Sequence, residues 1–117
     1  AGGAAAPRVS LANLLRDRGR LAEAEASYRS ALRLEGRDAR IRYDLGLLLE
    51  ERGRPAESAE EFRKAVDADP QDAELLRALA GGLERQGCAG EAARAWGKVL
   101  ALDPSDPEAR RRVPRRG

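Results

Sequence analysis

Residues 39–72 read ARIRYDLGLLLEERGRPAESAEEFRKAVDADPQD, and this stretch decides the fold because its informative positions recur 34 residues earlier and 34 residues later. Gly53, for example, has counterparts at Gly19 and Gly87. The same step relates Leu11, Leu45 and Leu79, then Leu15, Leu49 and Leu83, then Asp38, Asp72 and Asp106, and the aromatic residues Tyr28, Phe62 and Trp96. A fixed period of this size is typical of a stack of identical units, each of which buries its apolar face only against a neighbour.

Each unit predicts a pair of helices joined by a tight turn. Ile41, Leu45 and Leu49 are spaced four residues apart, so they lie on one face of a helix. Gly53 ends that helix, since glycine adopts the left-handed backbone without strain, and Pro55 is tolerated in the first turn of the next helix. The expected class is all-α, with helices over about residues 7–18, 21–34, 38–52 and 55–68, a third pair on either side of Gly87, and a short C-terminal helix.

The two ends of the chain carry weaker patterns than its centre. The helix over residues 7–18 is expected to present one apolar face, made of Leu11, Ala12, Leu14 and Leu15. Residues 1–6 have no periodic pattern, and we interpret them as a flexible linker. The repeat domain is expected over residues 7–106, with repeats at 5–38, 39–72 and 73–106, followed by a short capping helix and a basic tail over 107–117.

The repeat resembles the tetratricopeptide repeat (TPR) family, whose signature reads W-x2-L-G-x2-Y, then A-x3-F, then P. The second copy offers Arg42-x2-Leu45-Gly46-x2-Leu49, Ser58-x3-Phe62 and Pro70. The first has Arg8, Leu11, Ala12, Leu15, Ala24 and Tyr28, and the third has Leu76, Leu79, Ala80, Leu83, Ala92, Trp96 and Pro104. No copy has the first tryptophan, and Gly36 replaces the first closing proline. The resemblance covers residues 5–106 without insertion and implies an α-solenoid of three antiparallel helix-turn-helix repeats.

In the resembled family, the first helices of successive hairpins line a concave groove that binds an extended peptide or a helix of a partner protein. Transferring the exposed groove positions to this sequence gives Val9, Asn13, Arg16 and Asp17, then Arg40, Tyr43, Leu47, Glu50 and Glu51, then Glu74, Arg77, Gly81, Glu84 and Arg85. Arginines and acids nearly balance in this set, so it predicts no preference for acidic or basic ligands. The resemblance implies a non-catalytic protein-interaction module with another protein as its partner.

Tyr43 is the one aromatic residue outside the repeated packing position, and the resemblance places it on the groove side of its helix. Tyrosine is a favoured anchor in interfaces because it offers a large rigid surface and a hydroxyl group. The alternative is that Tyr43 packs against the adjacent hairpin. Both interpretations remain open from the sequence.

Some members of the family bind the C-terminal carboxylates of chaperones through a clamp of lysine, arginine and asparagine side chains. Asn13 matches one clamp position, whereas Val9, Asp44, Glu74 and Ala78 occupy the other four. Because two of these residues are acidic, they repel carboxylates. We therefore expect no binding of chaperone tails.

The charge of the chain is concentrated at its C-terminal end. The net charge is +2, but the last eight residues hold Arg110, Arg111, Arg112, Arg115 and Arg116. Residues 1–109 carry the remaining 17 basic residues and all 20 acidic ones. The repeats therefore give no indication of nucleic-acid binding, and salt-sensitive contact through the tail is kept only as an alternative.

The sequence predicts no active site, metal site, cofactor or membrane span. Cys88 is the only cysteine and histidine is absent, which excludes an internal disulfide and a four-ligand zinc site. The carboxylates are spread along amphipathic helices, as is typical of a solvated face. Gly82 and Gly87 have the spacing of a phosphate-binding loop, but the expected lysine does not follow. The apolar run over residues 45–49 is too short to cross a bilayer. We expect a cytoplasmic protein, and we expect that it is not an enzyme.

Two further features leave alternatives open. If residues 106–113 do not cover Trp96, Val99 and Leu100, more chain or another molecule is expected to do so, and a structural unit that stacks end to end through this apolar surface is the alternative function. Gly81 and Gly82 lie within a predicted helix, where each costs about 1 kcal/mol relative to alanine. We interpret the two glycines as neutral substitutions that the helix tolerates. The alternative is that they let a ligand approach the bare backbone closely.

Overall fold

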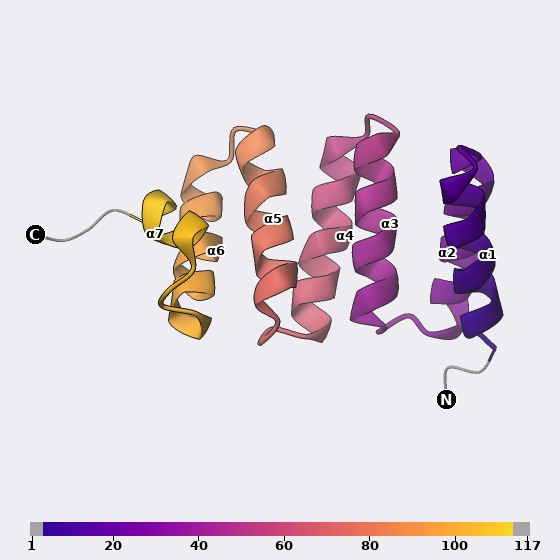
Figure 1. The fold of residues 1–117 in the computed structure, drawn as a ribbon, viewed down its shortest axis with the longest axis horizontal. Coiled ribbons are helices and arrows are strands. Elements are labelled where there is room, and N and C mark those ends of the chain that lie inside the picture. Colours follow the sequence, from indigo (N-terminus) through magenta and orange to yellow (C-terminus); the bar gives the residue numbers. More distant parts are fainter. Residues whose placement is uncertain (1–3, 114–117) are drawn as a thin grey trace, which may run out of the picture.

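The computed structural model describes residues 4–113, and within this range the chain forms seven α-helices and no strand (Figure 1). In chain order they are α1 (Ala6–Asp17), α2 (Leu21–Leu34), α3 (Ala39–Glu51), α4 (Pro55–Ala68), α5 (Ala73–Arg85), α6 (Ala89–Leu102) and α7 (Pro107–Arg112). The all-α prediction is confirmed. Arg115 and Arg116 of the predicted basic tail, and residues 1–3 of the predicted linker, lie outside the described residues.

The helix ends form as the repeated residues predict. Asp38 and Asp72 precede α3 and α5, and their carboxylates accept the free amides of Ile41 (3.1 Å) and Glu74 (2.9 Å). The turn within each hairpin contains a glycine with a positive φ, 76° at Gly19, 73° at Gly53 and 79° at Gly87. A side chain at these three positions would strain the backbone, so the 34-residue spacing of the glycines fixes where the hairpins turn.

The helices stack as three antiparallel hairpins along one axis (Figure 1). Helices α1 and α2, α3 and α4, and α5 and α6 pair within hairpins, while α2 packs on α3 and α4 packs on α5 between them. The chain is accordingly elongated, with extents of 51 × 30 × 19 Å. This architecture is the predicted solenoid of helix-turn-helix repeats.

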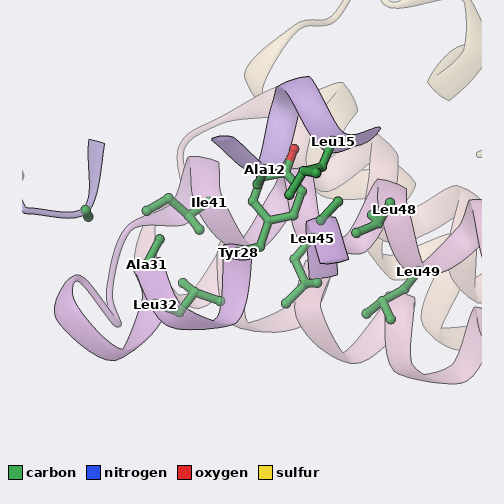
Figure 2. Packing of buried hydrophobic residues seen from close by; sticks show 11 residues of the cluster. Ala12, Leu15, Tyr28, Ala31, Leu32, Ile41, Leu45, Leu48 and Leu49 are labelled. Atoms are coloured by element: carbon green, nitrogen blue, oxygen red, sulfur yellow. The ribbon is translucent and has the colours of Figure 1, made fainter. Parts of the chain in front are cut away.

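Apolar side chains of neighbouring hairpins share one buried seam. Figure 2 shows Tyr28 of the first hairpin surrounded by leucines that include Leu45, Leu48 and Leu49 of the second. Tyr28, Leu45 and Leu48 have no solvent-exposed surface. Neither hairpin buries these residues without the other, which is why the repeats form one cooperative body.

Phe62 is the centre of the next seam. Its ring lies so close to Gly46 that a Cβ added there would come within 2.4 Å of Phe62 Cε1. A Cβ at Gly82, by contrast, would lie 3.6 Å from the same ring, which is ordinary contact. Gly46 is therefore required by packing, whereas Gly82 is not.

A buried charge cluster also joins the first two hairpins. Glu25 of α2 is 8% exposed, and its carboxylate accepts hydrogen bonds from Arg29 (2.9 Å), Arg52 (2.5 Å) and Arg54 (2.6 Å). Burial alone raises the pKa of Glu25, but these guanidinium groups lower the pKa below its ordinary value. The sequence pattern did not reveal this joint, because only the fold brings Arg52 and Arg54 to α2.

Helix α7 covers the C-terminal end of the stack. Trp96 is only 4% exposed, Val99 is fully buried, and Ala109 of α7 packs in the same cluster. Asp106 begins the helix by accepting the Ala109 amide at 2.9 Å. The apolar surface that suggested end-to-end stacking through Trp96 and Val99 is thus covered.

The N-terminal end differs from the prediction. Leu11 and Leu14 were expected on the buried face of the first helix, but each side chain is 49% exposed. Their counterparts in the second repeat, Leu45 and Leu48, are covered by the preceding hairpin, and no described residue covers α1 in that way. Ala5, predicted to belong to a flexible linker, is 2% exposed and packs in the first core cluster.

Candidate functional site

The first helices of the hairpins carry a pocket at the centre of the stack, between α3 and α5. Its volume is about 370 Å³. It is lined by Tyr43, Leu47, Glu50, Phe62, Glu74, Arg77, Ala78 and Arg85. We call this hollow the central pocket, and we call the surface formed by the predicted groove residues of α1, α3 and α5 the groove face.

Tyr43 forms one wall of the central pocket. Its ring lies 5.9 Å from the ring of Phe62, at an interplanar angle of 42°, and the Arg40 guanidinium lies 4.8 Å from its centroid. Burial raises the pKa of the Tyr43 hydroxyl above its ordinary value. Tyr43 therefore packs on Phe62 of α4, within its own hairpin, and the same ring also faces the pocket. This contact is not the packing against the adjacent hairpin that the sequence left open as an alternative.

Charged groups of the groove face pair between successive repeats. Arg40 Nη2 lies 2.9 Å from Glu74 Oε1, and these residues occupy the same position in their repeats. Arg16 pairs with Glu51, and Glu50 pairs with Arg85. In each pair the arginine neutralises the charge of a glutamate. The near balance of arginines and acids predicted from the sequence therefore arises by direct pairing across the groove face.

Two predicted groove residues hold the capping helix. Arg77 Nη1 lies 2.7 Å from Asp106 Oδ2, at the start of α7. Glu84 accepts from Trp96 Nε1 (3.2 Å) and from Arg112 Nε (2.7 Å). Arg77 still lines the central pocket, whereas Glu84 lines a separate hollow of about 440 Å³ beside Trp96 and Arg112.

The predicted groove residues of the first repeat do not reach the central pocket. Asn13 accepts a hydrogen bond from the Tyr28 hydroxyl, so its amide satisfies a buried polar group. Val9 is half-buried and packs against the first core cluster. Gly81 of the third repeat lies under the tip of Arg85, which is 3.4 Å from an added Cβ.

Asp44 is a carboxylate on the groove face that stays unpaired. It is half-buried on α3, and among residues 4–113 it forms no hydrogen bond or ion pair. Burial raises the pKa of its carboxyl above the ordinary value, and the nearby Arg40 and Arg16 offset this only in part. The sequence identified Asp44 only as a group that repels carboxylates.

A family model described as tetratricopeptide repeat matches residues 9–73, which is more than half of the chain. The chain belongs to the tetratricopeptide repeat family. The matched residues include the first two TPR hairpins and the start of α5. The comparison with curated protein sequences gave no match.

Solved TPR-like structures superpose on most of the chain at low sequence identity. The first TPR of Spaghetti (RPAP3), bound to the HSP90 peptide SRMEEVD, is 15% identical with a TM-score of 0.84, and the match covers 97% of this chain and 90% of that one. MamA is 20% identical with a TM-score of 0.85, over 93% of this chain and 60% of MamA. The Yersinia enterocolitica type III secretion chaperone SycD, in complex with a peptide of the translocator YopD, is 19% identical with a TM-score of 0.76, over 90% and 80%. These likenesses show a shared TPR fold.

Reasoning from the TPR positions alone missed three members of the site. Phe62 was assigned only to packing between repeats, yet its ring forms part of the pocket wall. Ala78 was considered only as a failed clamp position, but its small side chain leaves room for the hollow. The unpaired state of Asp44 had no signal in the sequence, because pairing depends on which side chains the stack brings within reach.

No group of three or more His, Cys, Asp or Glu side chains within residues 4–113 is arranged to hold a metal ion. Over the same range, none of the TPR helices is both long enough and apolar enough to cross a membrane.

Proposed function

We propose that this TPR chain is a non-catalytic protein-interaction module, which binds a segment of a partner protein on its groove face. The observation that carries the proposal is the central pocket, where Tyr43, Leu47, Phe62 and Ala78 offer apolar surface. An aromatic and aliphatic hollow with a charged rim has the composition of a hot spot in protein interfaces. The hollow is already formed in the free chain, which limits the ordering cost of binding.

Similar structures support a peptide as the ligand. Two of the superposed proteins, Spaghetti and SycD, are described in complex with peptides of other proteins. Their identity to this chain is too low to transfer the ligand itself. The shared architecture supports a peptide as the class of partner. The side chains of this groove face determine which peptide sequence binds.

The chemistry of the pocket argues against catalysis. Its two carboxylates, Glu50 and Glu74, each pair with an arginine. The arginine contact engages each carboxylate, so neither is presented free to a substrate proton. The central pocket therefore offers surface for binding and no group prepared for proton transfer.

A charged side chain placed in the central pocket is expected to weaken binding of the partner segment strongly. Short random peptides displayed on phage and selected on the wild-type chain supply a ligand, whose affinity fluorescence anisotropy measures. Leu47→Arg should weaken that affinity about tenfold or more, because it buries a charge among apolar groups. Leu14→Arg is the matched control, since this leucine is already exposed on the end face of α1, and it should leave the affinity unchanged.

Tyr43→Ala tests the anchor interpretation in the same assay. We expect a loss of about 1 to 2 kcal/mol in binding free energy, with a separate urea titration reporting the part due to lost packing on Phe62. Affinity unchanged within about 0.5 kcal/mol would show that Tyr43 is a packing residue and no anchor.

The chaperone peptide SRMEEVD is expected not to bind this chain. Asp44 places an unpaired negative charge where an acidic tail would lie, and the position of Glu74 carries an acid that pairs with Arg40 in place of a cation for the tail. Isothermal titration calorimetry should detect no saturable heat, and micromolar affinity would contradict the prediction.

Self-assembly remains a second candidate function, favoured now by the N-terminal end of the stack. Leu11 and Leu14 are exposed there, although their counterparts in the second repeat are buried between hairpins. A second copy or another repeat is the natural cover for such a surface. Light scattering separates the two functions, because a chain that stays monomeric at high concentration does not stack.

Nucleic-acid contact through the tail receives little support from the described part of the chain. Arg111 pairs with Glu108, and Arg112 lies 2.7 Å from Glu84. These arginines are engaged within the protein, so they contribute less to attraction of a phosphate backbone.

A further inference from the structure

The groove face keeps one carboxylate out of its ion-pair ladder. Arg16, Arg40 and Arg85 pair with glutamates, and Arg77 pairs with Asp106. Asp44 lies near two of these arginines, but both already have a glutamate partner. The negative charge of Asp44 is therefore neutralised by no direct contact within the described residues.

The surroundings of Asp44 give it no replacement for water. The groups that act on its charge are Arg16 of α1, Tyr28 of α2, Arg40 and Tyr43 on its own helix, Glu74 of α5, and Asp38 at the start of α3. The Tyr28 hydroxyl donates to Asn13, so it does not donate to Asp44. Half-burial without a donor makes the ionised carboxylate costly in the free chain.

We infer that the groove face recognises an extended segment carrying a lysine or arginine that pairs with Asp44 and a large apolar residue that enters the central pocket. The inference rests on the proposed function and names its ligand class. A cationic group is the complement that a half-buried, unpaired carboxylate lacks. An acidic or neutral segment at this point would leave the cost of burying Asp44 unrelieved.

The fold sets the distance between the two ligand residues. Asp44 does not line the central pocket and lies near Arg16 and Tyr28 of the first hairpin, whereas the pocket opens between α3 and α5. Neighbouring helix axes are about 8 to 10 Å apart. An extended chain advances about 3.3 Å per residue and points successive side chains to opposite faces, so the basic and apolar residues should be an even number of positions apart, about two to four.

The Asp44→Asn variant of the whole chain tests the inference, because asparagine keeps the shape of the aspartate side chain and removes its charge. Peptides selected from the random displayed library on wild-type protein should be enriched in lysine or arginine about two to four positions, an even number, from a large apolar residue. Against the best such peptide, Asp44→Asn should weaken affinity about tenfold, and so should changing the basic residue of the peptide to glutamine. Applied together, the two changes should cost little more than either alone.

Glu51→Gln is the matched control, because it removes a groove carboxylate that is already paired with Arg16. It should change the affinity far less than Asp44→Asn. An equal loss from both variants would indicate a general field effect and would overturn the assignment of Asp44.

Other outcomes separate this inference from the proposed function. Peptides that lose binding with Leu47→Arg but show no basic residue, or are indifferent to Asp44→Asn, would overturn the inference and retain the groove. If no selected peptide responds to Leu47→Arg, the groove function fails and the inference fails with it.

A stability measurement adds a readout that a structural role for Asp44 would not give. Since burial raises its pKa in the folded state, the ionised form at neutral pH disfavours folding, and that penalty disappears as the pH falls through the raised pKa. Asp44→Asn should therefore raise the urea midpoint of the free chain at neutral pH, and this gain should vanish in acid. A lower midpoint at neutral pH would show that Asp44 supports the fold and would overturn the inference.

Discussion

Leu45→Ala is expected to lower the free energy of unfolding by about 2 to 5 kcal/mol. The side chain of Leu45 is fully buried in the seam between the first and second hairpins (Figure 2). Truncation removes contacts on both sides of that seam and leaves a cavity that neither hairpin fills alone. Urea denaturation followed by circular dichroism measures the change.

Leu11→Ala is the matched control, because Leu11 occupies the same repeat position on α1. Its side chain is 49% exposed, so truncation removes little buried surface and should cost less than about 1 kcal/mol. The repeat pattern alone treats the two leucines as equals. Equal losses would contradict the fold described here, because they would require Leu11 to be buried, for example by a second copy of the chain. Burial by a second copy would make the urea midpoint depend on protein concentration.

Gly46→Ala is expected to destabilise the chain by about 1 to 3 kcal/mol, in spite of the better helix propensity of alanine. An added Cβ would come within 2.4 Å of Phe62 Cε1, so the ring or α3 must move. The first and third repeats carry Ala12 and Ala80 at this position, and a comparison of repeats would suggest that alanine is harmless here. Thermal and urea unfolding report the loss.

Gly81→Ala, on the first helix of the next hairpin, is expected to have the opposite sign. The nearest group to its added Cβ is the flexible tip of Arg85, 3.4 Å away, so the helix should gain up to about 1 kcal/mol. Combining Gly46→Ala with Phe62→Leu should cost less than the sum of the two, because the smaller side chain relieves the clash. A harmless Gly46→Ala would show that the Phe62 ring has another place to go.

The sequence predicted the helices closely because each boundary depends on a local rule. Asp38, Gly53 and Pro55 act within one turn of themselves, and their effect does not depend on the rest of the fold. Packing at the ends of the stack was predicted less well. Leu14 follows the same periodic rule as Leu48, but only the neighbouring hairpin decides whether such a leucine is buried.

The candidate site was predicted in outline and corrected in detail. Tyr43, Leu47, Glu50, Arg77 and Arg85 line the central pocket, as their groove positions suggested. Three other predicted groove residues make contacts elsewhere. Val9 packs against the first core cluster, Asn13 accepts a hydrogen bond from Tyr28, and Glu84 pairs with Arg112 of α7. The difference arises because repeat position fixes the side of the helix on which a residue lies, while its partner is supplied by another helix of the stack.

The sequence by itself determined the period, the class of secondary structure, the hairpin turns and the family, because all of these follow from short-range patterns repeated three times. Only the tertiary structure decided which charges are neutralised and which stay free, that Gly46 must remain a glycine, and that α7 covers Trp96. The charge pairing depends on distances between residues about one repeat apart, such as Arg40 and Glu74, whereas the contact of Gly46 with Phe62 lies between the two helices of one hairpin. Stacking the hairpins brings Arg40 and Glu74 together, and packing of α4 on α3 brings Phe62 onto Gly46, so neither contact follows from a repeated sequence position alone.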